Sequence, residues 1–169
     1  HNLGTFTQRV VELTDKICKK LNFNAIEFKQ MHQAALWEDI GMLKLPLTIV
    51  LKPIPLTMEE KKLVDTHVAI SCKFARMAGL DEQTVTLISL HHARVDNPLY
   101  TEGKRKTGLS PKAQLLHLIN NYVALQMDYP WRPAVRSALA LSLLANYIGK
   151  KYSPEVYEQF YNAVYDLEI

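Results

Sequence analysis

The stretch TMEEKKLVDTHVAISCKFARMAG (residues 57–79) decides the fold class, because it contains the start, the body and the end of one long helix. Thr57 is followed three residues later by Glu60, which is the spacing of a capping box at a helix N-terminus. Gly79 supplies the end signal, since glycine readily adopts the left-handed conformation that closes many helices. The sequence therefore predicts a helix between these signals, and His67 falls in its middle.

Two segments before this helix have apolar residues every three or four positions, the pattern of one helix face. They cover residues 5–21 and residues 26–39. Gly41 and Pro46 end the second helix and are expected to open an extended loop. The acidic pair Glu38-Asp39 therefore lies at the C-terminal end of a helix.

Four more helices are expected after Gly79. Asp81 is placed to cap a helix that leads directly into the pair His91-His92. Two later helices begin with Ser-Pro, at residues 110–111 and 153–154, and residues 133–148 between them are apolar enough for a buried helix. Because no segment alternates as a strand would, we predict an all-α fold, a single compact bundle of about seven helices over residues 1–169.

Composition narrows the class of protein. A chain of 169 residues with 48% apolar content is enough for one domain with a full core. The net charge of +3 is spread among acidic residues without a basic stripe, so a nucleic acid is not an expected partner. The longest apolar run, residues 138–145, is far shorter than the roughly 20 residues of a membrane span.

The cysteines and the first residues bear on where the protein works. Cys18 and Cys72 each lie in a helical apolar pattern and are expected to be buried thiols, which favours a reducing compartment, the cytoplasm. The chain begins HNLGTF, with neither an initiator Met nor a signal segment. We therefore expect it to be part of a longer protein.

Candidate metal ligands come from three of the expected helices. Asp39, His67, His91 and His92 together offer one carboxylate and three imidazoles, a set that suits Zn, Fe or Mn. A single histidine is more often structural than a ligand, so the prediction requires all four to meet. Two further histidines lack acidic partners at ligand spacing and are expected to be structural, namely His32 and His117.

The order of these motifs resembles the HD-GYP family of bacterial phosphohydrolases. The most specific parts are LKPIPLTMEE (51–60), THVAI (66–70) and LHHARVD (90–96), which occur in the order of that family and at about its spacing. The resemblance covers nearly the whole chain. It implies an all-α, HD-domain-like fold whose two or three metal ions, usually Fe or Mn, hydrolyse the bacterial messenger cyclic di-GMP.

The resemblance implies that only part of this centre is kept. The four candidate ligands match family positions, whereas Phe6 falls on a histidine, Asn120 on an aspartate and Glu38 on the histidine of the His-Asp pair. Glu38 is a further candidate ligand, because a carboxylate can replace an imidazole. Phe6 has no ligating atom and Asn120 offers only a neutral carbonyl. We therefore expect at most one transition metal, Fe, Mn or Zn, or none.

The resemblance also implies changes where the messenger would bind. The family motif Asp-Gly-x-Gly-Tyr-Pro is replaced by DNPLY, which leaves Asp96 and Tyr100 as candidate ligand-binding residues. Met42 replaces a lysine and Ala93 a glutamate. In the basic KRK cluster (104–106), Lys104 and Arg105 either belong to a solvated turn or attract a phosphoester or an acidic partner.

Three functions are consistent with these residues. The first is a catalytically impaired domain that binds cyclic di-GMP, another phosphoester or a signalling protein. The second is an active phosphohydrolase with one metal, or with two if Glu38 and Asn120 are ligands. The third is a structural or dimerising module. The lost ligands favour the impaired domain over the active enzyme, and the four kept ligands favour it over the structural module. Because we expect impaired catalysis, no residue is assigned a catalytic role.

Overall fold

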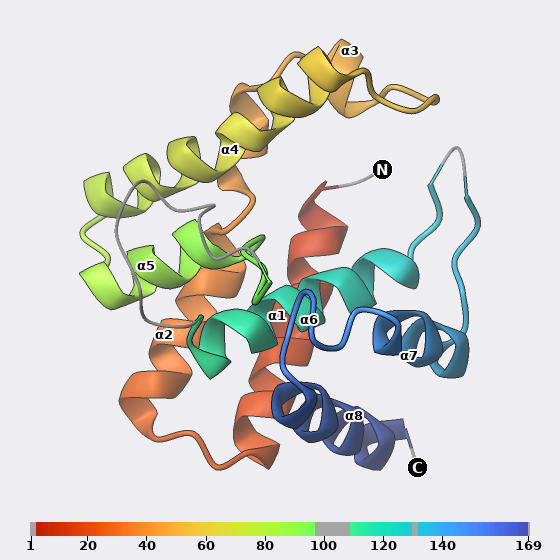
Figure 1. The fold of residues 1–169 in the computed structure, drawn as a ribbon. Coiled ribbons are helices and arrows are strands. Elements are labelled where there is room, and N and C mark those ends of the chain that lie inside the picture. The colour runs from red at the N-terminus through yellow and green to blue at the C-terminus, as the bar shows by residue number, and fades with distance from the viewer. Residues whose placement is uncertain (1–2, 97–108, 130–131, 169) are drawn as a thin grey trace.

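The computed structural model describes residues 3–96, 109–129 and 132–168, which form eight α-helices, one 3-10 helix and no strand (Figure 1). In chain order these elements are α1 (Leu3–Lys20), α2 (Ala25–Trp37), the 3-10 helix η1 (Ile40–Lys44), α3 (Leu47–Val50), α4 (Met58–Met77), α5 (Glu82–Leu90), α6 (Pro111–Leu125), α7 (Ser137–Ala145) and α8 (Pro154–Glu168). The all-α prediction is confirmed.

Helix α6 lies at the centre of the bundle. Figure 1 shows it crossing the middle of the molecule, with α1, α7 and α8 packed around it. Most of its residues are buried, and Leu116, Leu118 and Ile119 are fully so. Helix α1 contributes Val10 and Ile17 to the same core. The α2–α5 half of the fold rests on this core and contains every candidate metal ligand.

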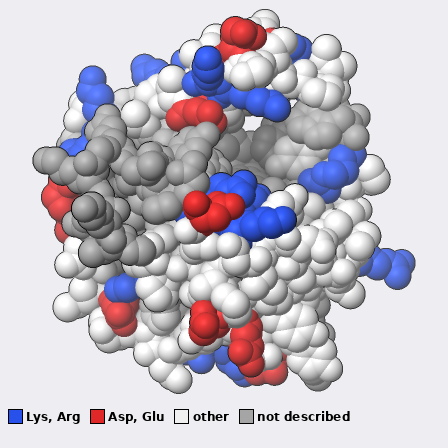
Figure 2. Space-filling model, viewed as in Figure 1, with Lys and Arg blue, Asp and Glu red and all other residues white. Residues whose placement is uncertain are grey.

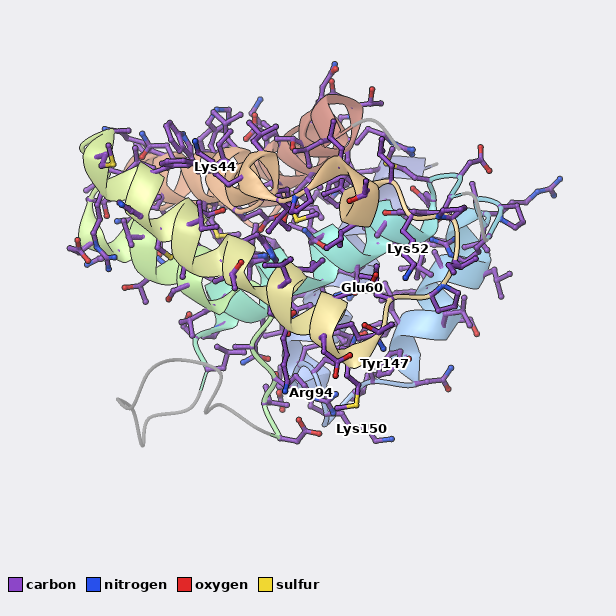
Figure 3. All side chains as sticks on the ribbon, turned by 90° about the horizontal axis from the view of Figure 1, so that it is seen from above. Lys44, Lys52, Glu60, Arg94, Tyr147 and Lys150 are labelled. Carbon is purple, nitrogen blue, oxygen red and sulfur yellow. The ribbon has the colours of Figure 1, made fainter. Side chains whose placement is uncertain are left out.

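The predicted start and end of α4 are confirmed. The Thr57 hydroxyl accepts a hydrogen bond from the Glu60 backbone at 3.2 Å, and the Glu60 carboxylate accepts one from the Thr57 backbone at 2.7 Å. The same carboxylate binds the Lys52 Nζ at 2.6 Å, as the two labelled side chains in Figure 3 show. Gly79 has a φ of 78°, the left-handed conformation expected at this helix end. The segment before α4 is therefore tied to the helix start.

Two predicted elements were wrong in part. Residues 47–50 form the single turn α3, and residues 40–44 form η1, where we expected an extended loop. One turn is too short to produce a periodic apolar pattern. The helix expected over 133–148 covers only Ser137–Ala145. The residues before it contact the end of α6 instead, where the Leu125 carbonyl accepts hydrogen bonds from the Arg132 guanidinium and the Val135 N–H. Helix α7 is also not buried all round, since the Leu139 side chain is 51% exposed.

The cysteines are buried as predicted, and neither is in a disulfide. Burial, together with the negative charges of Asp15 and Glu27, raises the pKa of the Cys18 thiol to about 12. In the part of the chain that the structure describes, every helix is too short or too polar to cross a bilayer.

Candidate metal centre

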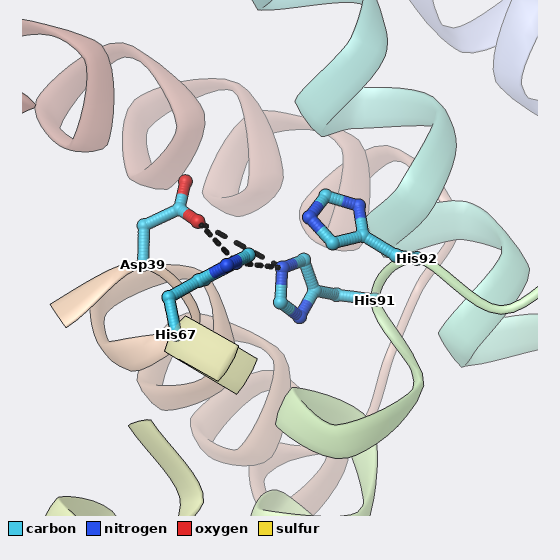
Figure 4. A group of neighbouring side chains, drawn as sticks. All are labelled: Asp39, His67, His91 and His92. Carbon is cyan, nitrogen blue, oxygen red and sulfur yellow. Dashed lines mark hydrogen bonds and ion pairs between the residues drawn. The ribbon is translucent and has the colours of Figure 1, made fainter. Parts of the chain in front are cut away.

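The four predicted ligands meet at one place, at the ends or middles of three helices (Figure 4). Asp39 lies between α2 and η1, His67 in the middle of α4, and His91 at the C-terminal end of α5 with His92 directly after it. One ligand atom from each of these residues lies within 4.8 Å of those of the other three. Because α5 ends at this point, the two adjacent histidines can both face one centre.

Gly41 allows this meeting. Its backbone N–H donates a hydrogen bond to the Ser71 hydroxyl at 2.9 Å, so η1 packs directly on α4. A Cβ atom at this position would collide with the backbone carbonyl of His67. The absence of a side chain at Gly41 therefore lets Asp39 approach the imidazole of His67.

Three of the ligands are packed tightly and shielded from solvent. The Asp39 Oδ1 atom lies 3.2 Å from His67 Nε2 and 3.8 Å from His91 Nε2, and the two Nε2 atoms are 3.3 Å apart. The side chains of His67 and His91 are 3% and 0% exposed, and that of Asp39 is 14% exposed. His92 is exposed, and its ring centroid lies 3.9 Å from that of His91.

The hydrogen bonds of the two buried imidazoles fit them to a metal ion. The Nδ1 atom of His67 lies 2.6 Å from the Val64 carbonyl, and that of His91 lies 2.6 Å from the Ile88 carbonyl. Each Nδ1 must carry a proton to donate to a carbonyl, which leaves Nε2 as the atom with a lone pair. Backbone carbonyls commonly orient metal-ligating histidines in this way. Two lone pairs that face each other at 3.3 Å need a proton or a cation between them.

The electrostatics agree with a buried ion pair at this place. Burial alone would raise the pKa of Asp39, but the hydrogen bond from His67 and the charges of the neighbouring imidazoles lower it to about 2. Burial opposes the charged form of His67, yet the hydrogen bond and charge of Asp39 raise its pKa. Burial lowers the pKa of His91. The site therefore keeps its carboxylate ionised and at least one imidazole neutral, as metal ligation requires.

The remaining candidate ligand, Glu38, lies next to this cluster and not within it. Its Oε1 atom accepts a hydrogen bond of 2.7 Å from the Asn120 amide on α6. Its Oε2 atom is buried and has no hydrogen-bond partner among the described residues. Burial and the charge of Asp39 raise the pKa of Glu38 well above its usual range. Phe6, at 5% exposure, is buried in the core cluster.

Of the predicted ligand-binding residues, only Asp96 is among the described residues, and it is not one of the clustered side chains. The carboxylate of Asp96 forms an ion pair of 2.6 Å with Arg94, and its backbone N–H donates to the carbonyl of Lys150 at 3.0 Å. Figure 3 labels Arg94 and Lys150, the two residues that Asp96 contacts. Asp96 therefore holds the chain that follows the double histidine. Tyr100, Lys104 and Arg105 lie outside the described residues.

The two histidines outside the cluster among the described residues, His117 and His32, have structural partners. His117 Nδ1 donates to the Ala93 carbonyl at 2.9 Å, so this buried residue of α6 holds the turn directly after His92. Sequence reasoning missed this supporting role, because no pattern connects α6 with that turn. His32 Nδ1 lies 2.9 Å from the Asp15 carboxylate, an acidic partner that is 17 positions away and not at ligand spacing. That pair joins α1 to α2, whose helical patterns do not reveal which residues face each other.

A cavity of about 460 Å³ opens beside the cluster and was also missed. Its lining comes from α1, η1, α3, the segment before α4, the first turns of α4, and α6, and most of it is apolar. The lining residues are Leu3, Phe6, Asp39, Met42, Ile49, Val50, Leu51, Lys52, Ile54, Pro55, Leu56, Lys61, Val64, Asn120, Ala124 and Tyr129.

On the face shown in Figure 2, basic and acidic side chains are interspersed, and the described residues there form no continuous basic stripe.

Comparison with known proteins gives one family. The sequence model of a family described as HD domain matches residues 2–156. A protein named cyclic di-GMP phosphodiesterase from Thermotoga maritima is 25% identical over 156 residues, which are 91% of this chain and 42% of that protein. Cyclic di-GMP phosphodiesterase PA4108 from Pseudomonas aeruginosa is 31% identical over 132 residues, which are 78% of this chain and 32% of that protein. The chain thus spans less than half the length of these relatives.

A solved structure has the same fold. The HD domain of the phosphodiesterase PgpH from L. monocytogenes superposes with a TM-score of 0.66 and 9% sequence identity. The match covers 94% of this chain and 88% of that one. The arrangement of helices around the cluster is therefore that of an HD domain.

Proposed function

Because the chain belongs to the HD domain family, we propose that it is a domain of bacterial cyclic di-GMP signalling that binds one transition metal and acts as a regulatory, ligand-binding or protein-binding module. Its metal ligands are Asp39, His67, His91 and His92. It has little or no phosphodiesterase activity. As in the named relatives, the domain works as part of a longer protein.

The observation that carries this proposal is the hydrogen bond between Asn120 and Glu38. It uses the Glu38 Oε1 atom as an acceptor for the amide of Asn120, the residue that stands where the resemblance implies an aspartate. Phe6, which also lies in the lining beside Asn120, adds bulk without a ligating atom. The four clustered ligands remain and suffice for one Fe, Mn or Zn ion.

One metal limits the chemistry. When bound, the ion would act as a Lewis acid and attract an anionic oxygen of a ligand. Hydrolysis by the paired-metal route uses two ions to stabilise both the attacking and the leaving oxygen, and this chain has ligands for one. Met42, a residue of the cavity lining, also has a thioether where the resemblance implies a lysine, a cation that could meet a phosphate. Loss of a single preorganised contact typically costs on the order of 10² to 10³ in rate, and several are missing here.

Metal analysis tests the binding part. The purified chain is loaded with Mn, Fe or Zn, desalted and analysed for metal per protein, beside the variant His67→Ala and the control His32→Ala, whose histidine lies outside the cluster. We expect about one equivalent of metal in the wild type and in the control, because all four ligands are intact in both, and none in His67→Ala. Equal metal content in all three proteins would show that the ligands are assigned wrongly.

A turnover assay tests the loss of activity. Steady-state hydrolysis of cyclic di-GMP is measured with each of the three metals added. We expect turnover far below about 1 per second, an ordinary rate for enzymes. Turnover near that value with any metal would refute the proposed impairment.

The second candidate is an active phosphohydrolase with two metals. The buried Glu38 Oε2 atom favours it, because an unpartnered carboxylate oxygen is an acceptor that a cation would satisfy. Two metal equivalents in the wild type and one in Glu38→Gln would support this candidate. Equal metal content in the two proteins would exclude Glu38 as a ligand.

A further inference from the structure

We propose that the cavity beside the metal centre binds a small amphiphilic carboxylate, with its anionic end on the metal ion and its apolar body against the cavity wall. This inference rests on the proposed single-metal function and names the class of ligand for that site. The volume of the cavity, about 460 Å³, falls within the range of roughly 300 to 1,000 Å³ that is typical of small-molecule sites.

The cavity has a polar inner end and an apolar outer part. Asp39 and Asn120 belong to the lining and are largely buried, with Phe6 at 5% exposure beside them. Leu51 and Ile54 belong to the same lining and are 53% and 58% exposed, so they lie at the mouth. A ligand that enters between these apolar residues meets the metal ligand Asp39 at the inner end.

Helix α4 sets the depth of the cavity. Lys61 and Val64 belong to the lining, and His67 follows one turn further along the same helix face. His67 lies six positions after Lys61, a rise of about 9 Å along the helix. The wall between the exposed Lys61 and the metal ligand His67 therefore has a length comparable to an octyl chain.

The charges of the lining match one anionic group better than a cyclic dinucleotide. A cyclic dinucleotide has two phosphates and two polar bases, which need polar partners when they are buried. Most of this lining is apolar. Of its two lysines, Lys52 is already paired with the Glu60 carboxylate at 2.6 Å, and Lys61 is exposed to solvent. A metal ion held by Asp39 and the three histidines would supply positive charge at the inner end, where Asp39 belongs to the lining.

Three probes test the two ends of the ligand separately. Octanoate has both ends, octanol lacks the carboxylate and acetate lacks the chain. Cobalt(II) replaces the native metal, because its visible absorption changes when a ligand coordinates it, and calorimetry measures affinity. We expect octanoate to bind at least tenfold more tightly than either acetate or octanol and to change the cobalt spectrum. Metal removal should weaken octanoate binding at least tenfold.

A matched pair of variants tests the location. Leu51→Asp places a charge at the mouth, directly after α3. Leu47→Asp places one at the start of α3 but outside the lining, at a residue that is 70% exposed. We expect Leu51→Asp to lower the affinity for octanoate at least tenfold and Leu47→Asp to keep the affinity of the wild type. Both should keep the wild-type cobalt content, because neither residue is a metal ligand.

The outcomes separate this inference from the proposed function. Absence of bound cobalt in the wild type would refute the proposed metal site itself. Normal cobalt content with octanoate no tighter than acetate would refute the inference alone. Equal octanoate affinity with and without cobalt would show that the carboxylate does not bind the metal, and equal effects of the two leucine variants would show that the cavity is not the site.

Discussion

The hydrogen bond between Asn120 and Glu38 should stabilise the metal-free protein by an amount that a double-mutant cycle can measure. The bond is 2.7 Å long and buried, and the other oxygen of Glu38 has no partner among the described residues. Asn120→Ala leaves the whole buried carboxyl group unpaired. Removing one partner of a buried hydrogen bond leaves the other partner unsatisfied, which costs about 1 to 3 kcal/mol, and the lost side-chain atoms add about 1 kcal/mol.

These terms predict that Asn120→Ala lowers the free energy of unfolding by about 3 kcal/mol. In a Glu38→Leu background the acceptor is gone and only the packing loss of about 1 kcal/mol remains. The coupling energy of the pair is therefore expected to be about 2 kcal/mol. With a urea m-value of about 2 kcal/mol/M, Asn120→Ala alone should lower the urea midpoint by about 1.5 M.

Urea denaturation of the four proteins in the presence of a chelator, followed by circular dichroism, gives this coupling. Asn121→Ala is the matched control, because Asn121 lies next to Asn120 on α6 and donates to the His117 carbonyl at 2.8 Å instead. Its coupling to Glu38→Leu should be below about 0.5 kcal/mol. A coupling of that small size for Asn120 itself would refute the view that the amide supports the buried carboxyl group.

Three further predictions concern the stability of the fold. The chain should remain helical when a chelator removes metal, because its core is formed by apolar packing around α6, and loss of the circular dichroism signal on chelation would contradict this. Burial lowers the pKa of His117 to about 4 from 6.5, so the unfolded state binds more protons between these values. Stability should fall by about 3 kcal/mol as the pH drops through that window, and the pH profile of His117→Asn in urea titrations should be flatter by about that amount. Gly41→Ala should lower the free energy of unfolding by about 1 to 3 kcal/mol, because its Cβ meets the His67 carbonyl, and an unchanged urea midpoint would show that η1 can shift away from α4.

Helix existence and most helix ends could be predicted because their causes are local. The capping box of Thr57 and Glu60, the left-handed Gly79 and the cap at Asp81 each act within a few residues of one another. The single turn α3 and the late start of α7 escaped prediction for the opposite reason. One is too short to show periodicity, and the other depends on contacts between Arg132 and the carbonyls at the end of α6.

For the site, the sequence by itself determined which side chains are able to bind a metal and which have lost that ability. Asp39 and the three histidines have ligating atoms and Phe6 has none, whatever the fold. Only the tertiary structure decided what their neighbours do. The carbonyls that orient His67 and His91 belong to their own helices. In contrast, Asn120 meets Glu38 across 82 positions of the chain, and the cavity is lined by residues from two distant segments, 3–64 and 120–129. Such pairs follow from how helix faces pack, because packing brings together residues that no local pattern connects.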